Sequence, residues 1–264
     1  MKINHISVSR SKTYEECPKK YHYRYHLEIA SPEEPFYFIY GKIVHKIAET
    51  FVASAGSRSI GEIQCDVLRG KIEIESGKTA PPIPVEYKRR MPTHLNHIRN
   101  ITEKIGYGGL IEHRFEFDLE PDNRKLVVGL IDRLIIKNER AFILDYKTTK
   151  PGKYRLNKDT IKKDLQLRTY ARVVNRDFGI KAENILCTVY YLEDGEKASV
   201  KFSESTLLNT EKELLDVYNQ IAAHDAEQVL GRTGEHCSRC EYRDLCPFFK
   251  KRWSGNNHWD GTMP

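Results

Sequence analysis

The chain has 264 residues, of which 39% are apolar and 30% charged, a composition typical of soluble globular proteins. It contains no run of eighteen apolar residues, which excludes a membrane-spanning helix. The N-terminus lacks the apolar segment of a secretory signal. These features favour a cytoplasmic location, or the host cytoplasm for a phage-encoded protein. The net charge of +6 permits a polyanionic partner.

The N-terminal part of the chain is predicted to be helical. Residues 9–16 resemble the start of a short helix with Ser9 as its N-cap, and Pro18 interrupts that pattern. Residues 40–55 carry apolar side chains on one face at helical spacing, which predicts an amphipathic helix. Residues 57–100 predict one or two helices and a proline-rich loop over residues 79–92.

The centre of the chain has the composition of β-strands. Three segments rich in β-branched and aromatic residues predict a meander over residues 113–120, 125–137 and 140–150. Further along, the pattern predicts a helix over 162–176, strands over 185–193 and 197–203, and a helix over 203–225 capped by Ser203 or Ser205.

These elements predict one domain of the α/β (α+β) class. Its parts are a helical N-terminal region over residues 1–105, a core over 106–203, a C-terminal helix and cysteine-rich region over 204–250, and a mobile tail over 254–264.

Two carboxylates and a lysine stand out in the predicted meander. Asp132 lies inside an apolar strand, and Asp145 ends the next one. Two buried carboxylates repel each other, and a divalent cation such as magnesium or manganese resolves this. Lys147 shares a strand face with Asp145, where its ammonium group can orient a water for attack on phosphorus and stabilise phosphate charge. The alternative is a strand-end salt bridge together with an Asp132–Arg133 pair.

The next helix adds Gln166 and Tyr170, which share one face because they are four residues apart. GLID (129–132), DYK (145–147) and QLRTY (166–170) resemble the PD-(D/E)XK nuclease superfamily, in particular its RecB-like branch. The N-terminal ISVSRSKTYEECPKKYHYRY and the segment YGKIVHKIAETF are similar to further parts of that branch. CRISPR-associated RecB-like exonucleases and the AddB nuclease domain belong to the same group.

The resemblance implies a restriction-endonuclease-like core, with a central mixed sheet flanked by helices and a cysteine-rich C-terminal cluster region. It implies magnesium or manganese as the cofactor, held by His45, Asp132, Asp145 and the backbone carbonyl of Tyr146. Lys147 would position the attacking water, while Gln166 and Tyr170 would support the site and contact the DNA strand. The next acidic candidates, Glu112 and Glu116, are interpreted as structural.

Four cysteines predict a second metal centre. Cys237, Cys240 and Cys246 lie within ten residues, and Cys17 can supply a fourth ligand. Their spacing leaves zinc and an iron–sulfur cluster equally open. The resemblance implies a [4Fe–4S] cluster, interpreted as a structural clasp between the two ends of the chain. Cys187 lies in an apolar strand and is predicted to be a core residue.

A basic and aromatic segment precedes the first long helix. PKKYHYRYH (18–26) interleaves tyrosines with cations, a pattern that suits a single DNA strand. The predicted DNA-binding residues are Lys19, Lys20, Tyr21 and Arg24, together with Tyr170. Ordinary packing of Tyr21 and Tyr25 on a helix face is the alternative.

The predicted function is a metal-dependent DNA exonuclease that prefers single strands or ends, with endonuclease activity also open. The settings considered are recombination and repair, phage DNA metabolism and CRISPR spacer processing. One alternative is a catalytically silent DNA-binding or scaffold subunit. Because the sequence carries no motor motif, a helicase that it served would be a separate partner. A homo-oligomer is possible.

Overall fold

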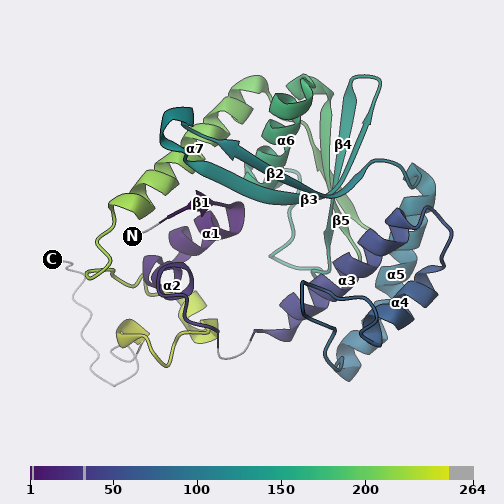
Figure 1. Ribbon diagram of the computed structural model, residues 1–264, viewed down its shortest axis with the longest axis horizontal. Helices are drawn as coiled ribbons and strands as arrows, with labels where there is room; N and C mark the ends of the chain where they lie inside the picture. The colour runs from purple at the N-terminus through teal and green to yellow at the C-terminus, as the bar shows by residue number, and fades with distance from the viewer. Residues whose placement is uncertain (2, 32–33, 250–264) are drawn as a thin grey trace. The chain divides into compact units, whose positions relative to one another are not determined.

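The computed structural model describes residues 1, 3–31 and 34–249, so the tail predicted over residues 254–264 lies outside the described residues. Figure 1 shows the course of the chain. The helices are α1 (Val8–Glu16), α2 (Pro18–Tyr21), α3 (Phe36–Ala53), α4 (Ile60–Leu68), α5 (Val85–Ile105), α6 (Leu165–Phe178) and α7 (Glu204–Ala223). The strands are β1 (His5–Ile6), β2 (Leu110–Asp118), β3 (Leu126–Lys137), β4 (Arg140–Lys147), β5 (Ile185–Tyr191) and β6 (Lys197–Val200). Short 3-10 or π segments cover His22–His26, Pro121–Asn123, Ile161–Lys163, Ala182–Asn184 and Glu235–Arg239.

The described residues form two compact units. Unit 1 consists of Met1–Glu34, Asp118–Val127 and the chain from Glu213 onward, and unit 2 consists of Pro35–Phe117 and Val128–Lys212. Three elements, β2, β3 and α7, begin in one unit and end in the other. The single-domain organisation stays a prediction.

Six strands of the described residues form a mixed sheet in the order β1-β3-β4-β5-β6, with β2 also pairing with β3. β3 and β4 are antiparallel, β4 and β5 parallel, and β5 and β6 antiparallel. The meander and the mixed sheet flanked by helices are therefore confirmed. The two-residue strand β1, which pairs in parallel with the start of β3, is too short to give a periodic sequence signal.

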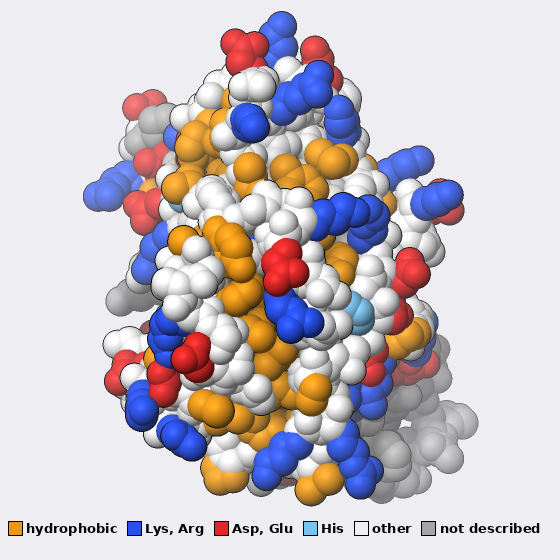
Figure 2. Space-filling model, turned by 90° about the vertical axis from the view of Figure 1, so that its right-hand side faces the viewer, with side chains coloured by type: hydrophobic (Ala, Val, Ile, Leu, Met, Phe, Trp, Pro, Cys, Tyr) orange, Lys and Arg blue, Asp and Glu red, His pale blue; other side chains and the backbone are white. Residues whose placement is uncertain are grey.

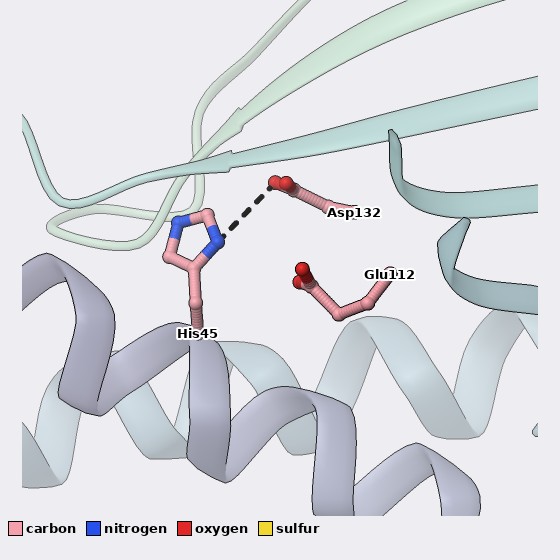
Figure 3. Close-up of side chains that lie close together, drawn as sticks. All are labelled: His45, Glu112 and Asp132. Atoms are coloured by element: carbon pink, nitrogen blue, oxygen red, sulfur yellow. Dashed lines mark ion pairs between the residues drawn. The ribbon is translucent and has the colours of Figure 1, made fainter. Parts of the chain in front are cut away.

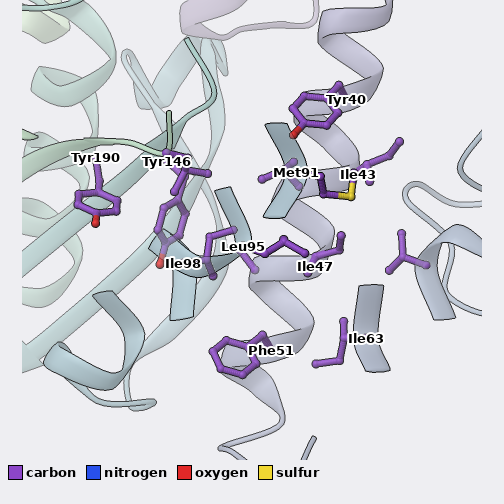
Figure 4. Close-up of a cluster of buried hydrophobic side chains, with 14 of the residues drawn as sticks. Tyr40, Ile43, Ile47, Phe51, Ile63, Met91, Leu95, Ile98, Tyr146 and Tyr190 are labelled. Atoms are coloured by element: carbon purple, nitrogen blue, oxygen red, sulfur yellow. The ribbon is translucent and has the colours of Figure 1, made fainter. Parts of the chain in front are cut away.

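The core of unit 2 lies between the sheet and the helices α3, α4 and α5 (Figure 4). Ile43, Ile47 and Phe51 form the buried face of α3, as the helical spacing predicts. They pack in one cluster with Leu144 and Tyr146 of β4. Because successive strand residues point to opposite faces, β4 presents its next side chains to the other side of the sheet.

The opposite face of the sheet carries α6. Cys187 of β5 is fully buried, as predicted, and its thiol donates to the carbonyl oxygen of Leu167 at 3.7 Å. Asp145 and Lys147 of β4 contact Gln166 of α6. The strand β4 therefore separates an apolar core on one face from a polar cluster on the other.

Two local predictions are corrected and one is confirmed. The N-cap of α1 is Ser7 rather than Ser9, because the Ser7 hydroxyl accepts from the Arg10 amide at 3.3 Å. The loop predicted over residues 79–92 ends at Pro84, and Pro92 lies within α5. The buried side of α5 continues through Pro92, so packing outweighs the helix-breaking preference of proline. The prediction of Ser203 as the α7 cap is confirmed by its bond from the Thr206 amide at 3.2 Å.

Apolar side chains also reach the surface of unit 2. Figure 2 shows the side of the molecule on which α4 and α5 lie, where hydrophobic side chains form a band beside Lys and Arg side chains. Leu68 and Val85 are exposed on these helices. Within the described part of the chain, every helix is too short or too polar to cross a bilayer.

Gly129 on β3 has a steric reason to be glycine. A Cβ atom built at this position would overlap the ring of the buried Phe115. We expect Gly129→Ala to lower the free energy of unfolding by about 1–3 kcal/mol, because the Phe115 ring must shift within a packed core. Denaturant unfolding measures this.

Gly61→Ala is the control for that substitution. Gly61 lies on α4 with open space around it, so alanine should stabilise the helix by about 0.5–1 kcal/mol. Equal stability of the Gly129→Ala variant and the wild-type protein would contradict the steric explanation.

Candidate active site

A cavity of about 610 Å³, called the site cavity below, opens in unit 2. Its walls come from α3 and from the strands β2, β3 and β4. His45, Glu112, Asp132 and Lys147 all line it. It therefore collects titratable side chains from segments that are far apart in the sequence.

Three metal-ligand side chains converge in this cavity. One donor atom each of His45, Glu112 and Asp132 lies within 4.8 Å of the other two. Figure 3 shows that His45 rises from α3 toward Asp132 and that the Glu112 carboxylate points into the space beside them. Two carboxylates and one imidazole are a donor set that suits a divalent cation such as manganese or magnesium.

His45 contacts two other residues predicted as metal ligands. Its Nε2 donates to the carbonyl oxygen of Tyr146 at 3.0 Å, and its Nδ1 lies 3.6 Å from Asp132 Oδ2. Burial lowers the pKa of His45, but the Asp132 carboxylate outweighs that effect and raises the pKa to about 9. The Asp132 carboxylate thus stabilises the charged form of His45.

The two carboxylates of the group respond differently to their surroundings. Burial works against ionisation of Asp132, but the adjacent His45 lowers the pKa of Asp132. Asp132 Oδ2 also accepts from the Tyr146 amide at 2.8 Å. Burial and the Asp132 charge raise the pKa of Glu112 to about 7. The backbone of Glu112 has a φ of 47°, a left-handed conformation that is rare for this residue type.

Asp145, which is buried, and Lys147, which is partly exposed, form an ion pair beside this group. Lys147 Nζ lies 3.0 Å from Oδ1 and 2.8 Å from Oδ2 of Asp145, which is only 1% exposed. Asp145 Oδ2 has no hydrogen bond of good geometry beyond this ion-pair contact. Burial raises the pKa of Asp145 to about 6, while the two aspartates keep the pKa of Lys147 above its usual value despite burial.

Gln166 and Tyr170 of α6 extend this ion pair. Gln166 donates through Nε2 to Asp145 Oδ1 at 3.2 Å, and its Oε1 accepts from Lys147 at 3.3 Å. The same Nε2 contacts the Tyr170 hydroxyl at 2.7 Å. The Tyr170 ring packs edge-on against Phe115 at 6.1 Å between ring centroids. The amide of Gln166 therefore fixes the ion pair from the α6 side.

The alternative of an Asp132–Arg133 ion pair finds no support. Arg133 is fully buried and donates to the backbone carbonyls of Gly106 and Gly108, the latter at 3.1 Å. Since neighbouring strand residues point to opposite faces, the charge of Asp132 is met by His45 rather than by Arg133.

The structure brings together in unit 2 all the residues predicted for catalysis and metal binding. They are His45, Asp132, Asp145, Tyr146, Lys147, Gln166 and Tyr170. Glu112 joins them, although the sequence indicated a structural role, whereas Glu116 of the same strand is exposed. The sequence feature that could have indicated this position is that Glu112 lies on β2, the strand that pairs with β3, which carries Asp132.

The predicted DNA-binding residues Lys19, Lys20, Tyr21 and Arg24 lie in unit 1. Tyr21 is only 1% exposed and packs edge-on against Tyr14. Lys20 and Arg24 lie 3.5 Å and 3.7 Å from Glu241 carboxylate oxygens. Burial leaves the Tyr21 ring no open face for a base, which favours the packing alternative for this residue.

The four predicted cluster cysteines also lie in unit 1, where Cys17, Cys237, Cys240 and Cys246 line one small cavity of about 20 Å³. No three of these sulfur atoms lie within 4.8 Å of one another; among the described residues, only the group around His45 meets that criterion. Tetrahedral zinc with a Zn–S distance of about 2.3 Å requires sulfur separations of about 3.8 Å. As placed, the four sulfur atoms are not arranged for one tetrahedral zinc ion.

A family model described as PD-(D/E)XK nuclease superfamily matches residues 5–247 of the chain. No curated protein matches it. The solved structure of SSO0001 has 14% sequence identity and a TM-score of 0.47, and the match covers 94% of this chain and 88% of that one.

A second solved structure, named "Putative exonuclease" from Eubacterium rectale, also has 14% identity, with a TM-score of 0.52. The match covers 90% of this chain and 88% of that one. At this identity the likeness shows the fold alone.

Glu112 can be tested as a metal ligand directly. We expect Glu112→Gln to weaken manganese binding by at least about 10-fold, because an anionic donor is lost from the group. Isothermal titration with manganese measures the affinity. Glu116→Gln makes the same charge change on the same strand but outside the group, and should bind manganese like the wild-type protein. Equal affinities for all three proteins would show that Glu112 is not a ligand.

Proposed function

The chain belongs to the PD-(D/E)XK nuclease superfamily, and on that premise we propose that it is a metal-dependent DNA exonuclease. It hydrolyses phosphodiester bonds and prefers single strands or strand ends. The observation that carries the proposal is the convergence of the His45, Glu112 and Asp132 donors with the Asp145–Lys147 pair in unit 2. An intact set of charged groups of this kind argues against a silent scaffold subunit.

The residues of the site cavity suit magnesium or manganese. His45, Glu112 and Asp132 would hold the cation, and Asp145 and the Tyr146 carbonyl complete the predicted ligand set. The Asp145 Oδ2 atom is buried and contacts Lys147, but it has no well-formed hydrogen bond. Its lone pairs can therefore coordinate the cation. A bound cation supplies Lewis-acid stabilisation of the negative charge on the phosphate.

Lys147 orients the attacking water and stabilises charge. Because the neighbouring aspartates raise its pKa, it stays an ammonium group and acts as a hydrogen-bond donor rather than as a base. From this position it holds a water for in-line attack and offsets charge on the phosphate oxygens. Asp145 and Gln166 restrict the ammonium group to one geometry, and Tyr170 in turn positions Gln166.

The four cysteines of unit 1 are proposed to hold a [4Fe–4S] cluster. Their shared cavity supports a common metal centre, and the resemblance implies that this centre is an iron–sulfur cluster. The cluster would join Cys17 to a segment about 220 residues later (237 minus 17). Its role in this proposal is structural, because closing so long a loop lowers the entropy of the unfolded chain.

The cellular setting rests on the resemblance alone. Recombination and repair, phage DNA metabolism and CRISPR spacer processing all stay predictions, as do a separate helicase partner, a homo-oligomer and a cytoplasmic location.

Lys147→Ala tests the nuclease proposal. We expect cleavage of labelled linear single-stranded DNA with manganese to fall about 100-fold or more, because a preorganised donor to the reacting phosphate is lost. Lys150→Ala is the matched control, since Lys150 is exposed just beyond β4, and it should cleave like the wild-type protein. Equal cleavage by the Lys147→Ala variant would identify a contaminant or a binding protein. A closed circular single strand digested as fast as the linear strand would contradict dependence on ends.

Cys240→Ala tests the cluster. We expect loss of the brown colour and of visible absorption together with lower thermal stability. The loop-closure contribution to this loss is about 5 kcal/mol for about 220 residues. Cys65→Ala removes an exposed thiol outside the group and should change neither property. Lower nuclease activity at unchanged stability would contradict the structural role, and zinc in place of iron in the purified protein would contradict the cluster.

A further inference from the structure

Two large aromatic side chains lie exposed at the start of α3. Tyr37 is 56% exposed and Phe38 49% exposed. Their ring centroids are 4.4 Å apart, with 36° between the ring planes. Both residues line the site cavity. A single exposed ring needs no explanation, but two rings in contact at the rim of a cavity form an aromatic surface that suits a flat ligand.

The spacing along α3 connects this surface to the metal-ligand group. Tyr37, Gly41 and His45 are four residues apart in turn and therefore share one helix face. From Tyr37 to His45 the helix rises about 12 Å, at 1.5 Å per residue. One strip of α3 thus runs from the aromatic pair to the imidazole of His45.

Gly41 lies midway along that strip. A Cβ atom at Gly41 would have no heavy atom within 4 Å, so packing does not require glycine here. Glycine within a helix is destabilising relative to alanine. Glycine here therefore costs helix stability without relieving any contact within the protein. Such a glycine is expected where a ligand approaches the backbone closely.

Two lysines on the neighbouring strip of α3 can contact the phosphate groups of a bound DNA strand. Lys42 and Lys46 continue from Phe38 at intervals of four residues and line the cavity. Lys42 lies 3.0 Å from Glu75, and Lys46 lies 2.9 Å from Glu49. Such partly exposed ion pairs contribute little to stability, so either ammonium group can turn toward a phosphate at small cost.

We propose that Tyr37 and Phe38 are a stacking surface for an unpaired base of the DNA strand, and that the space over Gly41 admits the strand between this surface and the metal-ligand group. The inference rests on the proposed nuclease function and names a source of its strand preference. Bases inside a duplex already stack on neighbours on both faces. An unpaired base, whose faces are open, is therefore a better ligand for the two rings than a base inside a duplex.

Leucine substitutions separate ring stacking from apolar volume. The Tyr37→Leu/Phe38→Leu variant, in a Lys147→Ala background that prevents cleavage, is measured by fluorescence anisotropy with a labelled single-stranded oligodeoxynucleotide and with a blunt duplex. We expect Kd for the single strand to rise about 5- to 100-fold, with the duplex changing less than about twofold. Tyr37→Phe keeps the ring and should bind like the background protein. Phe178→Leu removes an exposed ring outside the cavity and should have no effect.

Gly41→Ala separates binding from stability, because a glycine with a purely structural role would not affect single-strand binding. We expect Tm to rise by about 1–4 °C while single-strand binding weakens. Gly61→Ala on α4 should raise Tm and leave binding unchanged. Unchanged binding by the double leucine variant, equal losses for single strand and duplex, or unchanged binding by Gly41→Ala would each overturn the inference. If the wild-type protein cleaves DNA while these variants bind normally, only this inference fails. If it neither cleaves nor binds DNA, the proposed function fails with it.

Discussion

Burial of the Asp145 carboxylate at the end of a central strand is the constraint on which the site depends. A carboxylate that is 1% exposed is costly unless cations or donors surround it. Lys147 supplies the cation from the same strand, and Gln166 supplies an amide that serves both partners. The arrangement of α6 follows from this need, because its first turn must bring Gln166 to the strand end.

The strand β4 serves two purposes through the alternation of its side chains. Leu144 and Tyr146 belong to the apolar cluster with α3 and α5, whereas Asp145 and Lys147 face α6. A slip of one residue in strand pairing would exchange these faces. Packing of the core therefore fixes the geometry of the polar side chains. The backbone of Tyr146 extends the connection, since its carbonyl and amide contact His45 and Asp132.

Local patterns in the sequence predicted the long helices and strands, because apolar spacing is a property of adjacent residues. The polar side chains of β3, β4 and α6 were predictable for the same reason, since strand pairing and helical periodicity place them in register. The position of Glu112 beside His45 and Asp132 was not predicted, because its carboxylate reaches them through a left-handed backbone position that no pattern indicates. The burial of Tyr21 was left open because it depends on tertiary packing against Tyr14. In the same way, the position of Pro92 inside α5 depends on the packing of that helix, which a local sequence pattern does not indicate.

Unit 1 is assembled from separate stretches of chain, and this has a consequence for how the molecule is made. Its N-terminal stretch ends at Glu34, whereas its last stretch begins at Glu213. Since translation proceeds from the N-terminus, all of unit 2 is synthesised before the last stretch of unit 1 exists. Contacts such as the Tyr218 hydroxyl with the Ile3 carbonyl, at 3.0 Å, are therefore among the last to form. Unit 1 can therefore fold completely only after the residues from Glu213 onward have been synthesised.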